Sequence, residues 1–271
     1  MPTMRVNGVQ IHYFDQGTGV PMLFIHPPMI GAVSFAYQVQ ELCHKFRVVG
    51  FDIRGHGNSE PGSDRLTYQT IVNDAVVLLD ALAIDKAIVC GYSTGATVAM
   101  EAMLQYADTF QAGIFVSGMS EVSDFLVKRE IQLGVQLARI EAMGLLAYGL
   151  ALANTGYRPL QRAMYRAGRR SHPVRVVQYF AESLTYNCTS RLGDIKQPVL
   201  LAYGGKDRLF RPYGRILARN LPNATSVLIP GMTHQLPGRA PTALNRAIAD
   251  FAVQAERHGI LGENPKVLTE S

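Results

Sequence analysis

One serine stands in a sequence context that would make it a nucleophile. Ser93 is the central residue of Gly91-Tyr92-Ser93-Thr94-Gly95, which follows an apolar run ending at Cys90 and precedes a helical pattern beginning at Ala96. A sharp turn from a strand into a helix strains the serine backbone and exposes its hydroxyl at the end of the sheet. The amides at the start of that helix point toward developing negative charge. The alternative is a glycine-rich turn that contains an incidental serine.

A serine hydroxyl needs a neighbouring base to become a useful nucleophile, and the sequence contains seven histidines. His234 follows the predicted strand Ser226–Ile229. Its loop would lie at the carboxyl edge of the sheet, the edge that carries Ser93, so we predict that His234 is the base. His26 and His56 also follow strands, but their neighbours indicate a structural role. The remaining histidines are expected at the surface or in packing: His12, His44, His172 and His258.

The base in turn needs a carboxylate that orients it. Asp207 follows the predicted strand Val199–Tyr203 and two glycines, on an exposed loop at the same edge of the sheet. Asp124, just past the preceding strand, is the alternative acid. The chain order of nucleophile, acid and base distinguishes this arrangement from other serine hydrolase scaffolds. We therefore predict a triad of Ser93, Asp207 and His234.

The elements that would position these residues alternate between strands and helices. Apolar runs and alternating patterns predict strands, and apolar residues at helical spacing predict helices. This alternation indicates an α/β fold with a mostly parallel sheet and helices on both faces. Strands are expected at Val9–Phe14, Pro21–Ile25, Arg47–Phe51, Ala87–Cys90, Gly113–Val116, Val199–Tyr203 and Ser226–Ile229. Helices are expected at Phe35–His44, Thr67–Ala83, Ala96–Tyr106, Pro212–Asn220 and Ala240–Glu256.

The alternation stops between Met119 and Cys188, where the pattern is helical throughout. A helical segment inserted into an α/β sheet usually forms a cap over the active site, and a helical extension packed elsewhere is the alternative. Ser171-His172-Pro173 indicates the start of one of these helices, because proline is tolerated in a first turn. The predicted organisation is a first core segment at 1–118, a helical cap at 119–190, a second core segment at 191–258 and a frayed tail at 259–271.

The composition fits one large globular domain. The chain has 271 residues, of which 48% are hydrophobic and 17% charged. Its formal charge is +5, and nine Lys and Arg against five Asp and Glu fall between Gly118 and Ser190. This excess would attract anionic substrates or surfaces, or it forms a solvated helical face. No motif indicates nucleic-acid binding.

Several other partners are not expected. The three cysteines, Cys43, Cys90 and Cys188, are too widely spaced for a disulfide framework or a metal site. No dinucleotide fingerprint or phosphate loop is present, so we expect no cofactor. No apolar stretch reaches ~18 residues and no signal-like leader is present, so we expect no membrane span and a cytoplasmic location. The oligomeric state is left open, a homodimer included.

From Met4 to Arg257 the chain resembles the α/β-hydrolase family. The resemblance rests on the Ser93 motif, on the order of the three triad residues and on the loop Asp52-Ile53-Arg54-Gly55-His56-Gly57-Asn58-Ser59. That loop is similar to the family's loop after the fourth strand. The resemblance implies that Ser93 is the nucleophile, Asp207 the acid and His234 the base. It also implies that Met119–Cys188 corresponds to the helical cap between strands six and seven.

The oxyanion hole departs from the family pattern. In this family one amide comes from the residue after the nucleophile, here Thr94, and the second from a His-Gly-x loop after the third strand. The corresponding loop is His26-Pro27-Pro28-Met29, and Pro28 has no N–H. Losing one such donor typically lowers turnover ~100- to 1000-fold. We predict that the Met29 N–H points toward Ser93 Oγ. A substituting side chain or water is the alternative, and a cis peptide at either proline would re-aim Met29.

These features predict a cofactor-free serine hydrolase of small to medium carboxylic esters or lactones. Ser93 would attack the carbonyl, His234 would take its proton, and an acyl-enzyme would form and be hydrolysed. The same triad supports C–C bond hydrolysis, amide hydrolysis and perhydrolysis, whereas a serine nucleophile argues against haloalkane dehalogenase and epoxide hydrolase chemistry. A function of a different class is a receptor that binds a ligand and a partner protein with slow turnover, which Pro28 keeps open.

Overall fold

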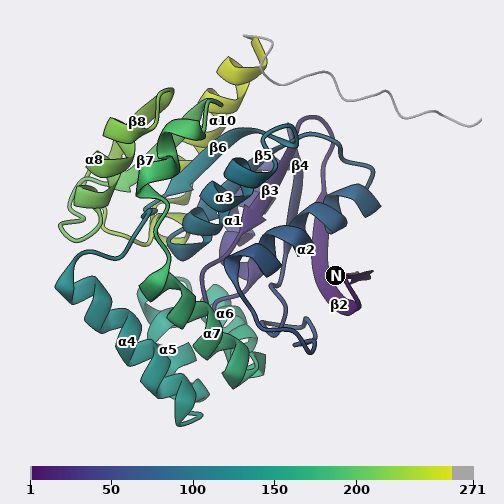
Figure 1. Cartoon of the computed structure of the whole chain (residues 1–271), viewed down its shortest axis with the longest axis vertical. Helices are drawn as coiled ribbons and strands as arrows, with labels where there is room; N and C mark the ends of the chain where they lie inside the picture. The colour runs from purple at the N-terminus through teal and green to yellow at the C-terminus, as the bar shows by residue number, and fades with distance from the viewer. Residues whose placement is uncertain (1, 258–271) are drawn as a thin grey trace, which may run out of the picture.

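The sheet has eight strands and is mostly parallel, which confirms the predicted α/β fold (Figure 1). The computed structural model describes residues 2–257. The strand order is β1-β2-β4-β3-β5-β6-β7-β8, where β2 pairs antiparallel with β1 and β4 and all other neighbours run parallel. The strands are β1 (Thr3–Val6), β2 (Val9–Gln16), β3 (Pro21–Ile25), β4 (Arg47–Phe51), β5 (Ala87–Tyr92), β6 (Phe110–Val116), β7 (Val199–Gly204) and β8 (Ala224–Ile229).

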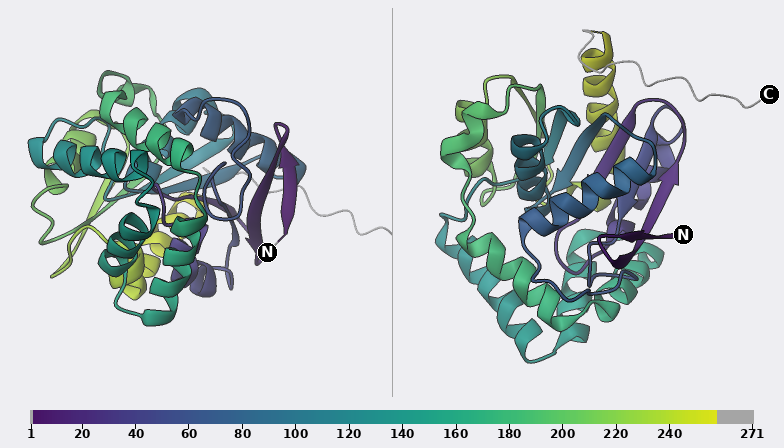
Figure 2. Two further views of the ribbon diagram at one scale, coloured as in Figure 1. Left: turned by 90° about the horizontal axis from the view of Figure 1, so that it is seen from below. Right: turned by 45° about the vertical axis from the view of Figure 1, so that its right-hand side comes forward.

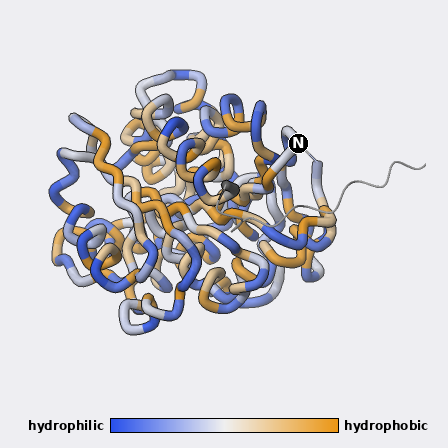
Figure 3. The backbone as a smooth tube through the Cα atoms, turned by 90° about the horizontal axis from the view of Figure 1, so that it is seen from above, coloured by the Kyte–Doolittle hydropathy of each residue, from blue (hydrophilic) through white to orange (hydrophobic). Residues whose placement is uncertain are grey.

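The central strands are covered on both faces. Every residue of β3, β5 and β7 is buried, which explains their continuous apolar sequences. Successive residues of β3 alternate between two hydrophobic clusters, one on each face: Leu23 belongs to the first and Met22 and Phe24 to the second. In Figure 3 the apolar residues concentrate along the central strands.

The strand pattern predicts β2 but not β1, although the turn that joins them has a local sequence signal. Between β1 and β2 the chain turns at Asn7 and Gly8, whose φ angles are 46° and 78°. An Asn-Gly pair with positive φ at both residues favours a tight two-residue hairpin turn. The N-terminal strand is therefore short and pairs only with β2.

Helices cover both faces of the sheet (Figures 1 and 2). Three of them contribute to the first cluster: α2 (Tyr68–Ala81), α3 (Thr94–Gln105) and α8 (Arg211–Asn220). The second cluster receives residues from η1 (Ala32–Phe35), α1 (Ala36–Leu42), α9 (Leu236–Arg239) and α10 (Pro241–Arg257). This two-sided packing fixes the edge of the sheet at which the strands β3, β5, β7 and β8 end.

Four helices between β6 and β7 form a distinct group, named here the helical insertion: α4 (Phe125–Arg139), α5 (Met143–Asn154), α6 (Arg158–Arg170) and α7 (Pro173–Thr185). α4 packs beside α7, and α5 packs beside α6 (Figures 1 and 2). α7 begins at Pro173, as Ser171-His172-Pro173 predicts. The predicted domain boundary at 190 falls within the short helix η2 (Thr189–Asp194).

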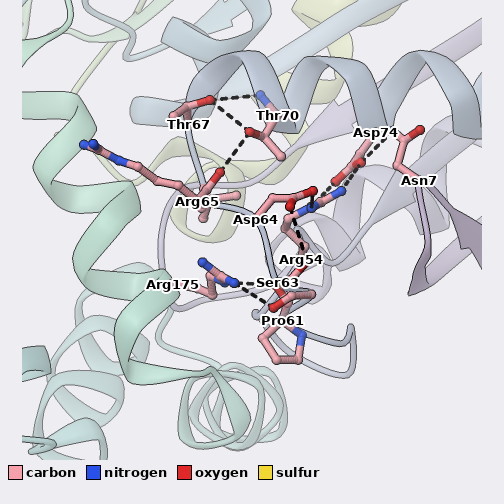
Figure 4. A network of polar contacts seen from close by, with 12 residues as sticks. Asn7, Arg54, Pro61, Ser63, Asp64, Arg65, Thr67, Thr70, Asp74 and Arg175 are labelled. Atoms are coloured by element: carbon pink, nitrogen blue, oxygen red, sulfur yellow. Dashed lines mark hydrogen bonds and ion pairs between the residues drawn. The ribbon is translucent and has the colours of Figure 1, made fainter.

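The loop after β4 joins the helical insertion to the sheet (Figure 4). Arg54 is buried and donates from Nε and Nη2 to the two carboxylate oxygens of Asp74 on α2, each at 2.6 Å. On the other side, Arg175 of α7 donates to the carbonyls of Pro61 at 2.9 Å and Gly62 at 2.6 Å. Because charge-assisted hydrogen bonds are strong, the two arginines hold this loop between α2 and α7.

Three further findings concern residues 2–257 alone. No helix in this range is long and apolar enough to cross a membrane. No group of three or more His, Cys, Asp or Glu side chains there could hold a metal ion. The three cysteines are free thiols. The predicted frayed tail at 259–271 and His258 lie outside the described residues.

Candidate active site

Ser93 lies at the turn between β5 and α3, where its motif predicts it. Its backbone has φ 55° and ψ −123°, a strained conformation for a residue with a side chain. Two glycines make the turn feasible. A Cβ atom at Gly91 would overlap the carbonyl oxygen of Gly95, and a Cβ atom at Gly95 would overlap the carbonyl oxygen of Ile25 on β3. Close packing of backbone against backbone therefore fixes the position of the serine.

His234 faces Ser93 from the loop after β8. Its Nε2 lies 3.0 Å from Ser93 Oγ, a hydrogen-bond distance. The ring centroid of Phe210 is 3.8 Å from that of the imidazole, and the ring of Tyr92 lies 5.4 Å away on centroids. Ser117 Oγ donates to the carbonyl of His234 at 3.0 Å. Ring packing and this backbone contact hold the imidazole where it can exchange a proton with the serine.

Asp207 lies on the far side of the imidazole. Its Oδ2 is 3.5 Å from His234 Nδ1, and neither atom has another hydrogen-bond partner within the described chain. Its Oδ1 accepts from the amide of Phe210 at 3.0 Å, which fixes the orientation of the carboxylate. The alternative acid, Asp124, instead caps α4 by accepting from the amides of residues 126 and 127 at 2.8 and 3.0 Å. The structure thus brings together the three residues named from the sequence and leaves Asp124 out.

Two histidines are buried behind this site. His26 Nδ1 donates to the carbonyl of Pro27 at 2.7 Å, and its Nε2 accepts from the amide of Ile53 at 3.0 Å. Burial lowers the pKa of His26, although the charge of Asp52 opposes the effect. Burial also lowers the pKa of His56, to about 3. Both rings are therefore neutral near pH 7, and the contacts of His26 give it the structural role expected from the sequence.

Asp52 is a buried carboxylate that the sequence did not single out. It follows β4, accepts from the amides of Ala32 at 2.9 Å and Asn58 at 3.0 Å, and pairs with His12 Nδ1 at 2.9 Å. Burial on its own raises the pKa of Asp52, but the hydrogen bond from His12 and those from the two amides help to outweigh burial, and the pKa is lowered. The ionised carboxylate ties the loop after β3 to the loop after β4.

The loop after β3 makes a tight turn at Met29. Met29 is fully buried with φ 76°, and the amide of Ile30 donates to the carbonyl of Pro28 at 3.0 Å, two residues back. No cis peptide bond occurs in residues 2–257, so both proline peptides are trans and the cis alternative is wrong. Pro28 and Ile30 line the space in front of Ser93. The Met29 amide makes no hydrogen bond within the described chain, and the direction of its N–H stays a prediction.

A tyrosine of the helical insertion contacts the same loop. Tyr179 of α7 is fully buried, and its hydroxyl donates to the carbonyl of His26 at 2.9 Å. Its ring packs edge-on against His56 and Tyr68, with centroids 5.6 and 5.9 Å away. Helical periodicity identifies Tyr179 as a core residue but gives no signal for a partner 153 positions earlier. The contact links the insertion to the loop that contains Met29.

A cavity of about 430 Å³ opens in front of Ser93, between the sheet edge and the helical insertion. The lining includes the carboxylate of Glu130, at the rim, and the imidazole of His234, but no Lys or Arg. The positive charge of the insertion therefore lies outside the cavity. Met119, which precedes α4, also lines it. Apolar residues of α4, α5 and α7 form much of the wall: Val127, Ile131, Leu133, Leu137, Leu145, Leu146, Leu150, Ala153 and Phe180.

Comparisons with known proteins concern the sequence and the fold of the chain. The sequence profile of the alpha/beta hydrolase family matches residues 22–247. A protein of Caulobacter sp. (strain K31) named "Putative carbamate hydrolase RutD" is 30% identical over 229 residues, which cover 80% of this chain and 84% of that protein. The serine hydrolase BPHL of Mus musculus is 26% identical over 92% of this chain and 84% of that protein. The crystal structure of the enol-lactonase from Burkholderia xenovorans LB400 is similar with a TM-score of 0.81 at 23% identity, covering 93% of this chain and 100% of that one.

Proposed function

Since the chain belongs to the α/β-hydrolase family, we propose that it is a serine hydrolase of small to medium neutral carboxylic esters or lactones. The observation that carries the proposal is the position of Ser93 Oγ, 3.0 Å from His234 Nε2 beside an apolar cavity. A hydroxyl within reach of a base, which is itself oriented by a carboxylate, is the arrangement that activates a serine.

The proposed reaction passes through an acyl-enzyme. Ser93 Oγ attacks the substrate carbonyl while His234 Nε2 accepts its proton, and the imidazolium then returns that proton to the leaving alcohol. A water molecule next gives a proton to His234 and attacks the acyl group, which releases the acid and restores the serine. Asp207 Oδ2, 3.5 Å from His234 Nδ1, stabilises the imidazolium in both steps. With a lactone, acid and alcohol leave as one hydroxy acid.

The amides of Thr94 and Met29 are the proposed oxyanion donors. Thr94 is the first residue of α3, where the helix dipole favours developing negative charge. The Met29 amide has no partner within the described chain and follows Pro28, which has no N–H of its own. We propose that the second donor is therefore one residue further along than in the usual loop. Strained residues such as Met29, with its φ of 76°, are often kept at active sites.

The residues that line the cavity favour neutral, apolar substrates. It offers no Lys or Arg to anchor a carboxylate or phosphate, and the exposed Glu130 at the rim would repel an anion. A volume of about 430 Å³ lies within the range of small-molecule sites. The names of two similar proteins, a carbamate hydrolase and an enol-lactonase, add carbamates and enol lactones to the substrates worth testing.

An activity-based probe tests the nucleophile directly. A fluorophosphonate should label the wild-type protein on the peptide that contains Ser93 and should not label Ser93→Ala. Hydrolysis of p-nitrophenyl esters and lactones should fall by ~10³-fold or more in Ser93→Ala. Ser63→Ala, on an exposed loop, is the matched control and should behave as wild type. Labelling that persists in Ser93→Ala, or wild-type protein that stays unlabelled, contradicts the proposal.

The substrate panel also separates the alternatives. Amides, carbamates, 1,3-diketones and a perhydrolysis assay cover the other reactions that the same three residues support. Turnover near one event per protein, together with a ligand-dependent rise in melting temperature, would favour a receptor instead. In that case a Met29 amide turned away from Ser93 would explain the slow turnover, because Pro28 has no N–H to donate in its place.

A further inference from the structure

Helix α5 carries an exposed apolar stripe. Its sequence, from Met143 to Asn154, contains no charged residue, although only one of its faces is buried. Leu145, Tyr148 and Leu152 are 63, 60 and 50% exposed and, with Gly149, recur at i, i+3, i+4 and i+7. A helix that is apolar all round is normally buried, so this outward face lacks the partner that its composition indicates.

The neighbouring helix α6 carries a stripe of arginines. Arg158, Arg162, Arg166 and Arg169 are exposed and lie on one side of the helix, opposite the buried Leu160, Met164 and Gly168. α6 contains no acidic residue, and none of these arginines forms an ion pair within the described chain. The positive charge of the helical insertion is therefore concentrated on this helix and uncompensated there.

The two stripes meet, and they meet beside the catalytic cavity. α5 and α6 lie side by side (Figure 2), and a surface groove between them is lined by Tyr148 and Leu152 from one helix and Arg158 and Arg162 from the other. At the other flank of the same stripe, Leu145 also lines the cavity that contains Ser93. Leu133 of α4, 59% exposed, lines the same cavity, so the exposed apolar surface reaches the mouth of the cavity from two helices.

We propose that this surface, the α5–α6 face (Leu145, Tyr148, Leu152, Arg158, Arg162 and Arg166), docks on an anionic lipid bilayer. The apolar stripe would enter the interface between headgroups and acyl chains, and the arginines would pair with lipid phosphates. Long arginine side chains reach headgroups while their stems cover apolar surface. A second copy of this chain fits the face less well, because two arginine stripes would then approach each other. Docking would place the mouth of the cavity next to the bilayer, within reach of apolar molecules dissolved in it.

Vesicle binding tests the proposal, with Ser93→Ala as the background so that binding is measured without turnover. The protein should co-sediment with phosphatidylcholine vesicles containing 30% phosphatidylglycerol and should bind pure phosphatidylcholine about tenfold or more weakly. Salt at 0.5 M should weaken the binding, because exposed charges are screened. Leu145→Ser/Leu152→Ser should lower the partition coefficient about tenfold.

The contribution of the α6 arginines is tested against a matched pair of arginines on α8. Arg158→Gln/Arg162→Gln should lower the partition coefficient by about tenfold or more. Arg215 and Arg219 on α8 have the same i, i+4 spacing and are exposed, but α8 presents no large exposed apolar side chain among the described residues and lies away from α5 and α6 (Figure 1). Arg215→Gln/Arg219→Gln removes the same charge and should bind like the parent protein. Melting temperatures verify that each variant is folded.

Three outcomes would overturn the proposal. The first is an absence of binding to the anionic vesicles. The second is an equal loss of vesicle binding in the α6 and α8 charge variants, which would mean that the protein adsorbs nonspecifically. The third is a stable dimer, seen by ultracentrifugation, that Leu145→Ser/Leu152→Ser dissociates, because the occupant of the face is then a second copy. None of these results depends on whether Ser93 hydrolyses esters.

Discussion

The sheet edge and the helical insertion form opposite walls of one cavity, but they are built under different constraints. At the sheet edge a single added Cβ atom at Gly91 or Gly95 would overlap backbone, and Ser93 itself is held at a positive φ. On the insertion, a Cβ atom at Gly149 would meet nothing within 4 Å, although this residue lines the same cavity. From this difference we expect the edge to fix the chemistry and the insertion to select what reaches it. Substitutions at the edge should lower turnover, whereas substitutions in the insertion should change substrate range.

The largest expected effect is at the edge, in Asp207→Asn. An amide cannot stabilise an imidazolium as a carboxylate does, and it favours the wrong tautomer of His234, so kcat should fall by ~10⁴-fold for esters. Asp207 is buried and an asparagine has nearly the same shape, so the melting temperature should change little. Steady-state kinetics with p-nitrophenyl butyrate, combined with thermal melts, measure both quantities.

Asp124→Asn is the matched control for this prediction. Asp124 caps α4, and asparagine caps a helix about as well as aspartate, so kcat should stay within about twofold of wild type. A large loss in Asp124→Asn with a small loss in Asp207→Asn would exchange the two assignments. It would also mean that a residue of the insertion takes part in the chemistry.

A smaller effect is expected where the two regions touch, in Tyr179→Phe. The hydroxyl of Tyr179 donates to the carbonyl of His26, so its removal frees the loop that contains Met29 without leaving a large void. A hydrogen bond of this kind contributes about 0.5–1.5 kcal/mol, which corresponds to a roughly two- to tenfold fall in kcat. KM should stay nearly constant, because Tyr179 does not line the cavity.

The neighbouring Tyr68 provides the control for Tyr179→Phe. Its ring packs 5.9 Å from that of Tyr179, and its hydroxyl makes no hydrogen bond at normal distance within the described chain. Tyr68→Phe should therefore leave kcat unchanged. If both variants lower the melting temperature and kcat in parallel, Tyr179 supports the fold in general and does not position the loop that contains Met29.

The sequence predicted the sheet edge well because its signals are local or follow from topology. The turn at Ser93 combines a buried apolar strand, small residues and a helical pattern within a few positions. Asp207 and His234 are distant in the chain, but each follows a parallel strand, and the carboxyl ends of parallel strands converge at one edge. The fold class follows from the same alternation of buried strands and helices.

Contacts between side chains far apart in the chain were not predictable. Helical periodicity shows that Tyr179 is buried but not that it contacts His26, and strand alternation does not show that His12 pairs with Asp52. Two prolines in a row remove an amide donor from the loop after β3 without indicating where the turn at Met29 directs its N–H. These features depend on how separate elements pack, which a pattern of burial leaves open.

A still smaller effect on the chemistry is expected from the helical insertion, in Gly149→Leu. Gly149 lies within α5, where leucine is the better helix former, so stability should be kept or raised by up to ~1 kcal/mol. The new side chain would narrow the cavity, so kcat/KM for p-nitrophenyl octanoate should fall about tenfold relative to acetate, measured in vesicle-free buffer. Gly193→Leu, at an exposed position with equal free space that does not line the cavity, should leave this ratio unchanged. An equal loss of kcat/KM for acetate and octanoate would mean that the insertion affects the chemistry itself. That result would contradict the separate roles expected for the two walls.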